Sequence, residues 1–156
     1  MKVFKLERKQ YINLPIKTVF KFFSSPENLE QITPKTLRFK ILSPSPIKMG
    51  PGALIDYTIR LFFIPVHWRT LISEYNPPFT FIDQQLKGPY SFWHHTHTFI
   101  EKDGGVEIID SVRYSIPFGL IGRILNWLWI RKELERIFDY RFKAIENYFS
   151  NNNSES

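Results

Sequence analysis

The hydrophobic pattern of the chain changes its period once, just after Pro117-Phe118-Gly119. Before this point apolar and polar residues mostly alternate, as in strands that bury one face. After it, apolar residues recur every three or four positions as far as Phe149. That spacing predicts one amphipathic helix of about 28 residues, roughly 40 Å long. Because the helix must bury its apolar stripe, we expect it to lie across a sheet in an α+β fold.

The alternating part of the chain predicts about seven strands. We expect them at residues 2–14, 37–42, 53–62, 66–75, 79–86, 90–101 and 106–115. The links between the later strands are short and rich in Gly, Pro and Asn, which favours antiparallel neighbours and leaves no room for helical crossovers. Two short helices are expected after the first strand, the second with Ser25 as N-cap and Pro26 in its first turn. A curved sheet under one helix tends to leave a hollow, which is where function would lie.

Length and composition fit one domain over residues 1–150, followed by a polar tail at 151–156. The chain has no cysteine, so disulfides and thiolate chemistry are excluded. Its first residues lack the apolar run of a secretion signal, and no stretch has the apolar length of a membrane span. We therefore expect a cytoplasmic protein. The sequence does not indicate its oligomeric state.

The net charge of +6 raises the question of nucleic-acid or anionic-membrane binding. The basic residues are scattered, however, and the nearest cluster is only Lys35, Arg38, Lys40 and Lys48. Because no nucleic-acid-binding motif accompanies them, we expect no nucleic-acid partner. The aromatic fraction of 17% is high and fits either the walls of a hollow or simply a bulky core.

Several segments carry a resemblance to a known superfamily. They are Trp68-Arg69-Thr70-Leu71-Ile72, Gly88-Pro89-Tyr90, the run Trp93–Phe99, the run Tyr114–Gly119 and Phe138-Asp139-Tyr140-Arg141. With the order of elements, they resemble the START, polyketide-cyclase and birch-pollen-allergen (SRPBCC) superfamily. Within it they look like a bacterial subgroup also found fused to NAD-dependent epimerase-like domains of the cell-division-inhibitor type. The resemblance implies a helix-grip fold and a ligand cavity. It implies no NAD site, because this chain has no epimerase half.

The strand patterns predict which side chains face the hollow. His95 and His97 share one strand face with Trp93. If the aromatic-rich faces all point to the helix, polar side chains from neighbouring strands converge beside them. A slip of one residue would invert this arrangement. The predicted ligand-binding residues are Tyr57, Thr70, Phe81, Asp83, Gln85, Trp93, His95, His97, Asp110, Tyr114, Phe138 and Arg141.

Three interpretations of the polar group remain open. Two His at i and i+2 with a carboxylate can bind a divalent metal. A His–Asp pair can act as a general acid or base, with His95, His97 and Asp110 as catalytic candidates. Buried polar groups can also satisfy one another and orient a ligand, which is the interpretation we prefer. We therefore expect no metal and no cofactor. No motif marks Ser91 or Ser111 as a nucleophile.

Trp127 and Trp129, with Arg131, lie near the start of the predicted long helix, and Phe62-Phe63-Ile64 lie at a strand connection. Both groups can form a cavity entrance or touch a membrane transiently. Ordinary helix packing with one exposed Trp is the preferred interpretation. Arg141 either pairs with acids on its own helix or reaches inward to an acidic ligand.

The leading hypothesis is therefore a binding protein for a small hydrophobic or aromatic molecule, such as a lipid, a polyketide or a quinone-like compound. The alternative is a cyclase-, dehydratase- or hydrolase-like enzyme that uses a His–Asp pair in the same cavity. A third possibility is an interaction module, which predicts a large exposed apolar patch.

Overall fold

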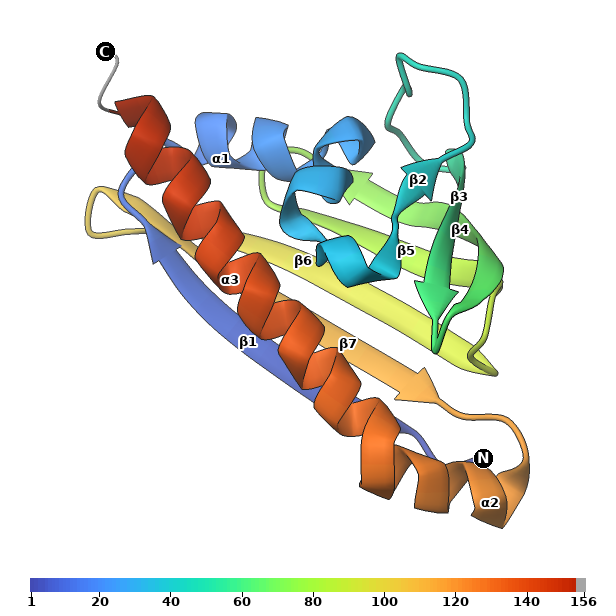
Figure 1. Cartoon of the computed structure of the whole chain (residues 1–156). Helices are drawn as coiled ribbons and strands as arrows, with labels where there is room; N and C mark the ends of the chain where they lie inside the picture. Colours follow the sequence, from blue (N-terminus) through green and yellow to red (C-terminus); the bar gives the residue numbers. More distant parts are fainter. Residues whose placement is uncertain (154–156) are drawn as a thin grey trace.

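The computed structural model describes residues 1–153, with side chains through residue 152 (Figure 1). One strand and a short helical region precede six further strands, and a long helix completes the chain. The elements are β1 (Phe4–Ile12), α1 (Ile16–Phe23), η1 (Pro26–Ile32), η2 (Lys35–Leu37), β2 (Lys40–Ile41), β3 (Leu54–Leu61), β4 (Ile64–Asn76), β5 (Thr80–Lys87), β6 (Phe92–Lys102), β7 (Gly105–Ser115), α2 (Gly119–Leu125), η3 (Asn126–Ile130) and α3 (Arg131–Asn153).

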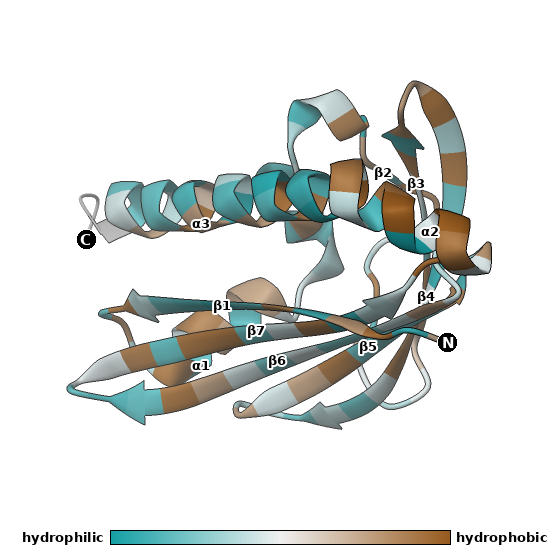
Figure 2. Cartoon of the chain, turned by 90° about the horizontal axis from the view of Figure 1, so that it is seen from below, coloured by the Kyte–Doolittle hydropathy of each residue, from teal (hydrophilic) through white to brown (hydrophobic). Residues whose placement is uncertain are grey.

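The strands form one antiparallel sheet of seven, in the order β1-β7-β6-β5-β4-β3-β2. Consecutive strands from β2 to β7 are neighbours, and β1 pairs with β7 along its whole length. The sheet curves strongly, so that β2 and β3 rise to the level of the helix while β1 and β7 run beneath it (Figure 2). This confirms the expected curved antiparallel sheet.

The C-terminal helix runs without interruption through α2, η3 and α3, and it lies across the concave face of the sheet (Figures 1 and 2). Residues 126–130, which join α2 to α3, have π-helical hydrogen bonding. Leu134, Phe138, Ile145 and Phe149 form its buried stripe. Their spacing is the one that predicted the helix, so both its existence and its placement over the sheet are confirmed.

The region after β1 differs in detail from the expectation. The first short helix is α1, but the second, η1, is a 3₁₀ helix. Pro26 occupies its first turn as predicted, whereas the Ser25 hydroxyl does not cap it. That hydroxyl instead donates to the carbonyl of Lys21, 2.7 Å away, so the preceding helix takes the group.

The second strand is much shorter than the predicted 37–42. A 3₁₀ turn, η2, occupies residues 35–37, and Arg38 then adopts a left-handed backbone with φ of 45°. Only Lys40 and Ile41 pair with β3. The left-handed residue turns the chain out of extended conformation, which is why the strand cannot begin at Leu37.

The connection between β3 and β4 is a two-residue turn at Phe62 and Phe63, with φ of 49° and 67°. Positive φ at both central positions is typical of the tight hairpin turns that normally use Asn and Gly. A left-handed backbone costs a bulky residue ~1–2 kcal/mol. The expected connection at Phe63-Ile64-Pro65 is therefore displaced, because β4 already begins at Ile64.

The start of the long helix is more exposed than expected. Trp127 is 77% exposed and Trp129 54%, so ordinary helix packing with one exposed Trp is wrong. Phe79, the first residue of the strand expected at 79–86, is also exposed, because it lies in the turn before β5. α3 includes residues 151–153 of the predicted polar tail, and residues 154–156 lie outside the described part.

Within residues 1–153, no helix is long and apolar enough to cross a membrane.

Candidate functional site

A cavity of about 170 Å³ lies between the inner face of the sheet and the C-terminal helix. Strands β3 to β6 form its floor, α3 its roof, and the 3₁₀ segments η1 and η2 close one side. Most of its wall is aromatic or aliphatic. The polar or ionisable side chains in the wall are Tyr57, Thr70, Asp83, Tyr90, His95, His97 and Arg141, with Thr33 at the η1 side.

Nine of the twelve predicted ligand-binding residues line this cavity. They are Tyr57, Thr70, Phe81, Asp83, Trp93, His95, His97, Phe138 and Arg141. The strand register thus places both histidines on the inner face, where each is 4% exposed.

Three predicted residues do not line the cavity. The Gln85 side chain exchanges hydrogen bonds with the backbone of Tyr90 at the β5–β6 turn. The Tyr114 hydroxyl donates to Asn126 Oδ1, 2.9 Å away, beneath the helix. Asp110 lies behind the two histidines, on the helix side of β7. Strand period gave each residue the correct face, but the curvature of the sheet decides which part of that face borders the hollow.

Sequence reasoning missed several wall residues. Trp68 stacks on Tyr57 and contacts Trp93 edge-on, with ring centroids 5.9 Å and 5.2 Å apart. Its position two residues before Thr70 on β4 was the available signal, since both share a strand face. Tyr90 gave no such signal, because it lies in a turn. The remaining missed residues include Leu37, Phe39, Met49, Ile55, Ile59, Leu134 and Ile137.

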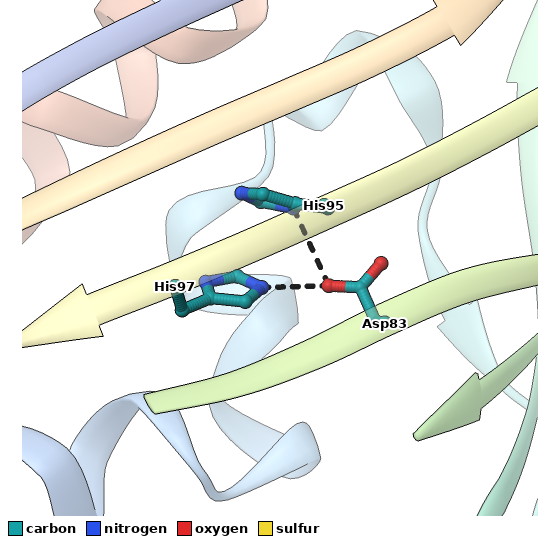
Figure 3. Close-up of side chains that lie close together, drawn as sticks. All are labelled: Asp83, His95 and His97. Atoms are coloured by element: carbon teal, nitrogen blue, oxygen red, sulfur yellow. Dashed lines mark hydrogen bonds and ion pairs between the residues drawn. The ribbon is translucent and has the colours of Figure 1, made fainter. Parts of the chain in front are cut away.

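His95, His97 and Asp110, all buried, form a closed ring with the partly buried Asp83 at one side of the cavity. Asp83 Oδ2 lies 2.6 Å from His97 Nε2 and 3.3 Å from His95 Nδ1 (Figure 3). Asp110 Oδ1 lies 3.0 Å from His95 Nε2 and 3.1 Å from His97 Nδ1. The imidazole rings are 3.8 Å apart. Every ring nitrogen of both histidines thus lies within 3.3 Å of a carboxylate oxygen.

Strand pairing positions this ring. His95 and His97 stand two residues apart on β6 and therefore point to the same face. Asp83 on β5 is the direct partner of His95, and Asp110 on β7 is the direct partner of His97. Cross-strand partners have Cβ atoms about 5 Å apart, which suits a direct imidazole–carboxylate contact. The ring is thus fixed by rigid backbone on three adjacent strands.

The two histidines differ in protonation. Burial lowers the pKa of His95 below its ordinary value, and the neighbouring His97 lowers it further. Burial also opposes protonation of His97, but its close contacts with the carboxylates of Asp110 and Asp83 outweigh this and raise its pKa. The arrangement therefore favours a protonated His97 beside a neutral His95.

Both carboxylates stay ionised. Burial alone would raise the pKa of Asp110, but the Arg141 guanidinium and the two histidines hold that pKa well below its usual value. The histidines overcome the same burial effect at Asp83 and lower its pKa. With Arg141 and a protonated His97 against two aspartates, the buried group carries no net charge. Such compensation is what allows ionised side chains to remain buried.

Asp83, His95 and His97 also offer three possible metal-ligand atoms within 4.8 Å of one another. The 2.6 Å separation of His97 Nε2 and Asp83 Oδ2 fits a shared proton better than two ligands of one ion. Ligands about 2.0–2.2 Å from a tetrahedral zinc would lie further apart than this. This geometry therefore favours a ring of paired histidines and aspartates over a metal centre.

Among the described residues, three buried side-chain nitrogens of cavity-lining residues have no hydrogen-bond partner: Nε1 of Trp68, Nδ1 of His97 and Nε of Arg141. Arg141 Nε lies 3.8 Å from Asp110 Oδ2, which is an ion-pair distance and not a hydrogen bond. Burial also raises the pKa values of Tyr57 and Tyr90, so both wall hydroxyls stay protonated. The cavity thus presents several donors at its polar side.

No protein-family model and no curated protein matches the sequence. Solved structures do match over nearly the whole chain. TTHA0849 from Thermus thermophilus is 14% identical with a TM-score of 0.74, covering 93% of this chain and 96% of that one. The Zhui aromatase/cyclase from a Streptomyces species is 12% identical with a TM-score of 0.72, covering 96% and 94%. Ara h 8.0201 is 18% identical with a TM-score of 0.65, covering 96% and 99%.

These matches share the arrangement of a curved antiparallel sheet gripping a long C-terminal helix. They agree with the resemblance on which the fold was expected, while the bacterial subgroup with fused epimerase-like domains stays a prediction. The chain therefore has the helix-grip fold of the birch-pollen-allergen-like and polyketide-cyclase proteins.

Proposed function

We propose that this protein binds a small, largely apolar molecule that carries a hydrogen-bond acceptor, in the cavity between the sheet and α3. One observation carries the proposal: aromatic and aliphatic side chains line a hollow that a cluster of buried polar side chains borders. Ligand sites typically combine an apolar lining with a few placed polar groups in this way. Burying charged side chains costs free energy even when they are paired, so a core that served only stability would not need this ring beside a hollow.

The donors at the polar side indicate the chemistry of the ligand. Within the described part of the chain, Trp68 Nε1 and Arg141 Nε are buried N–H groups without an acceptor, and such groups are costly to leave unpaired. A ligand carbonyl, phenolate or carboxylate would satisfy them. The flanking Tyr57, Trp68 and Trp93 rings suit a flat partner. Among lipids, polyketides and quinone-like compounds, the last two combine flat rings with carbonyl oxygens.

Size sets a further limit. A protein cavity of about 150 Å³ holds one benzene molecule. At about 170 Å³, this cavity accepts roughly one ring in its present shape. A larger ligand requires side chains or the 3₁₀ segments at its side to move outward. The proposal therefore expects cavity-lining residues to shift when a multi-ring compound binds.

Native mass spectrometry of gently purified protein, followed by solvent extraction, tests the proposal. Ile59 lines the cavity, and Ile59→Phe fills part of it. Thr58→Phe adds the same ring to the preceding residue of β3, which is not among the cavity-lining residues. We expect a reproducible bound mass in the wild type and Thr58→Phe that is lost in Ile59→Phe. Equal occupancy in both variants would show that any bound molecule lies elsewhere.

A second candidate function is acid–base catalysis in the same cavity. It is favoured by His95 and His97, which border the cavity and contact Asp110 and Asp83. Against it, every imidazole nitrogen already faces a carboxylate, so none is free to meet a substrate. Incubating the extracted molecule with wild type and His95→Gln decides between the two. Turnover that is lost in the variant while binding persists would establish an enzyme.

A further inference from the structure

An exposed apolar surface surrounds the start of the C-terminal helix and the β3–β4 turn. We call it the aromatic rim. It consists of Phe62, Phe63, Ile64, Phe118, Leu120, Ile121, Ile124, Trp127, Leu128 and Trp129, each at least partly open to solvent. Phe63 is 93% exposed, which leaves nearly its whole ring in water. Isolated exposed apolar residues are ordinary, but such a concentration marks an interaction site.

Three rim residues are held in an unfavourable backbone conformation. Phe62, Phe63 and Phe118 all have left-handed φ, at 49°, 67° and 71°. These turns would form more easily with Asn or Gly, and the rings gain nothing from burial because they are exposed. Folding alone therefore does not explain the phenylalanines. Strained residues at an exposed position point to a function for their side chains.

The charge around the rim has one sign. Residues 111–132 contain no Asp or Glu but include Arg113, Arg123, Arg131 and Lys132. The β3–β4 segment from 57 to 66 likewise has Arg60 and no acid. Acids return at Glu133, where Glu135 pairs with Arg131 at 3.1 Å. The balanced charge of α3 thus begins where the rim ends.

The two parts of the rim lie at one end of the cavity. Leu61, directly before the β3–β4 turn, and Leu134, in the first turn of α3, both line it. Leu61 and Ile130 also pack against the same core cluster around Trp68 and Trp93. Figure 2 shows hydrophobic α2 at the same end of the molecule as β2, β3 and β4. The rim therefore flanks one end of the hollow.

We propose that the aromatic rim docks this protein onto a membrane surface rich in anionic lipid. Tryptophan and phenylalanine partition into the boundary between headgroups and acyl chains, and flanking Arg and Lys contact anionic headgroups. The positive charge also argues against a second copy of the chain as the occupant, because two such surfaces would repel each other. The inference does not depend on what the cavity binds. It gives a place where a lipid-soluble ligand could enter directly from a membrane.

Vesicle sedimentation tests the proposal on the full chain. One set of vesicles contains equal parts phosphatidylglycerol and phosphatidylcholine, and the other contains phosphatidylcholine alone. We expect the protein to sediment with the anionic vesicles, with much weaker binding to the neutral ones and at high salt. The fluorescence of exposed Trp127 and Trp129 should shift to shorter wavelength on binding, while Trp68 and Trp93 are already buried.

Three variants sharpen the test. Trp127→Ser should weaken vesicle binding at least about tenfold, because one large ring no longer leaves water. Phe62→Asn with Phe63→Gly introduces the residues that the turn prefers, so it should raise the melting temperature while weakening vesicle binding. Phe79→Ser is the control, since Phe79 is an exposed aromatic in the β4–β5 turn, outside the rim. It should bind like the wild type.

Three outcomes overturn the proposal. In the first, the protein ignores anionic vesicles, or binds them equally well with the turn replaced and Trp127 removed. In the second, sedimentation velocity shows that the wild type is a dimer and that Trp127→Ser is a monomer, while neither protein binds vesicles. That result would assign the rim to contact between protein chains. Loss of binding in Phe79→Ser as well would exclude a specific role for the rim.

Discussion

The Nε2 atom of His97 lies 2.6 Å from the Oδ2 atom of Asp83, on the neighbouring strand and at the wall of the cavity. The other nitrogen of the same imidazole lies 3.1 Å from Asp110. One ring therefore bridges two carboxylates that would otherwise repel each other. This bridge explains how two acids remain ionised beside an apolar hollow.

Asp83→Asn should lower the pKa of His97, because the imidazolium loses one of its two charged acceptors. We also expect the free energy of unfolding to fall by ~1–3 kcal/mol, the usual cost of disrupting a buried polar contact. NMR titration of the imidazole nitrogens and urea denaturation measure the two effects. Asp56→Asn is the matched control, since Asp56 contacts His67 at 2.7 Å outside the ring. An unchanged His97 pKa in Asp83→Asn would contradict the bridge.

Stability should respond to pH in opposite directions at the two histidines. The folded pKa of His97 is raised, so its contribution is full below the unfolded value of 6.5 and is lost as pH rises through the folded pKa. The folded pKa of His95 is lowered, so its contribution is present above the unfolded value of 6.5 and is lost as pH falls through the folded pKa. The pKa values of Asp83 and Asp110 are lowered, so both carboxylates stay charged throughout.

Urea denaturation from about pH 6 to about pH 9 measures this difference. The stability gap between wild type and His97→Gln should shrink as pH rises. The corresponding gap for His95→Gln should not shrink over the same range. Parallel pH profiles for the two variants would mean that the histidines share their proton equally.

Arg141→Met should weaken binding of the extracted ligand by about tenfold, because it removes a buried donor that has no acceptor among the described residues. The methionine keeps an apolar stem over Phe23 and Phe138, which the guanidinium now covers at 5.6 Å and 5.9 Å. The pKa of Asp110 should rise at the same time, since its neighbouring cation is lost. Titration of the ligand into each variant, followed by tryptophan fluorescence, measures the affinity.

Arg136→Met is the control for this experiment. Arg136 forms an exposed pair with Glu133 on the same helix, and such pairs contribute at most about 1 kcal/mol. Ligand affinity should be unchanged. Equal losses in both variants would point to a general effect on the helix.

Tyr114→Phe separates a structural residue from a ligand-binding one. The Tyr114 hydroxyl donates to buried Asn126 in the π-helical turn, so its loss should cost ~1–3 kcal/mol of stability. The bound mass seen by native mass spectrometry should not change, because Tyr114 does not border the cavity. If Tyr114→Phe kept full stability but lost its ligand, Tyr114 would have to be a ligand-binding residue.

The sequence alone was enough to predict most of the strands, the long helix and the faces of the strands that carry the polar cluster. Alternation along β6 placed Trp93, His95 and His97 on one side, and the spacing of Leu134, Phe138 and Ile145 predicted the helix above them. These are local consequences of side-chain direction in strands and helices, so they can be read without the fold. The short links between strands then implied an antiparallel sheet.

Only the tertiary structure decided which of those faces border empty space. Asp83 and Asp110 both point inward, yet one lines the cavity and the other lies behind the histidines. Trp68 and Tyr90 become wall residues, while Tyr114 joins the helix contact, because sheet curvature and the path of the long helix fix distances between strands. The same packing leaves Trp127 in water. Periodicity fixes the direction of a side chain, but it contains no information about what the opposite layer covers.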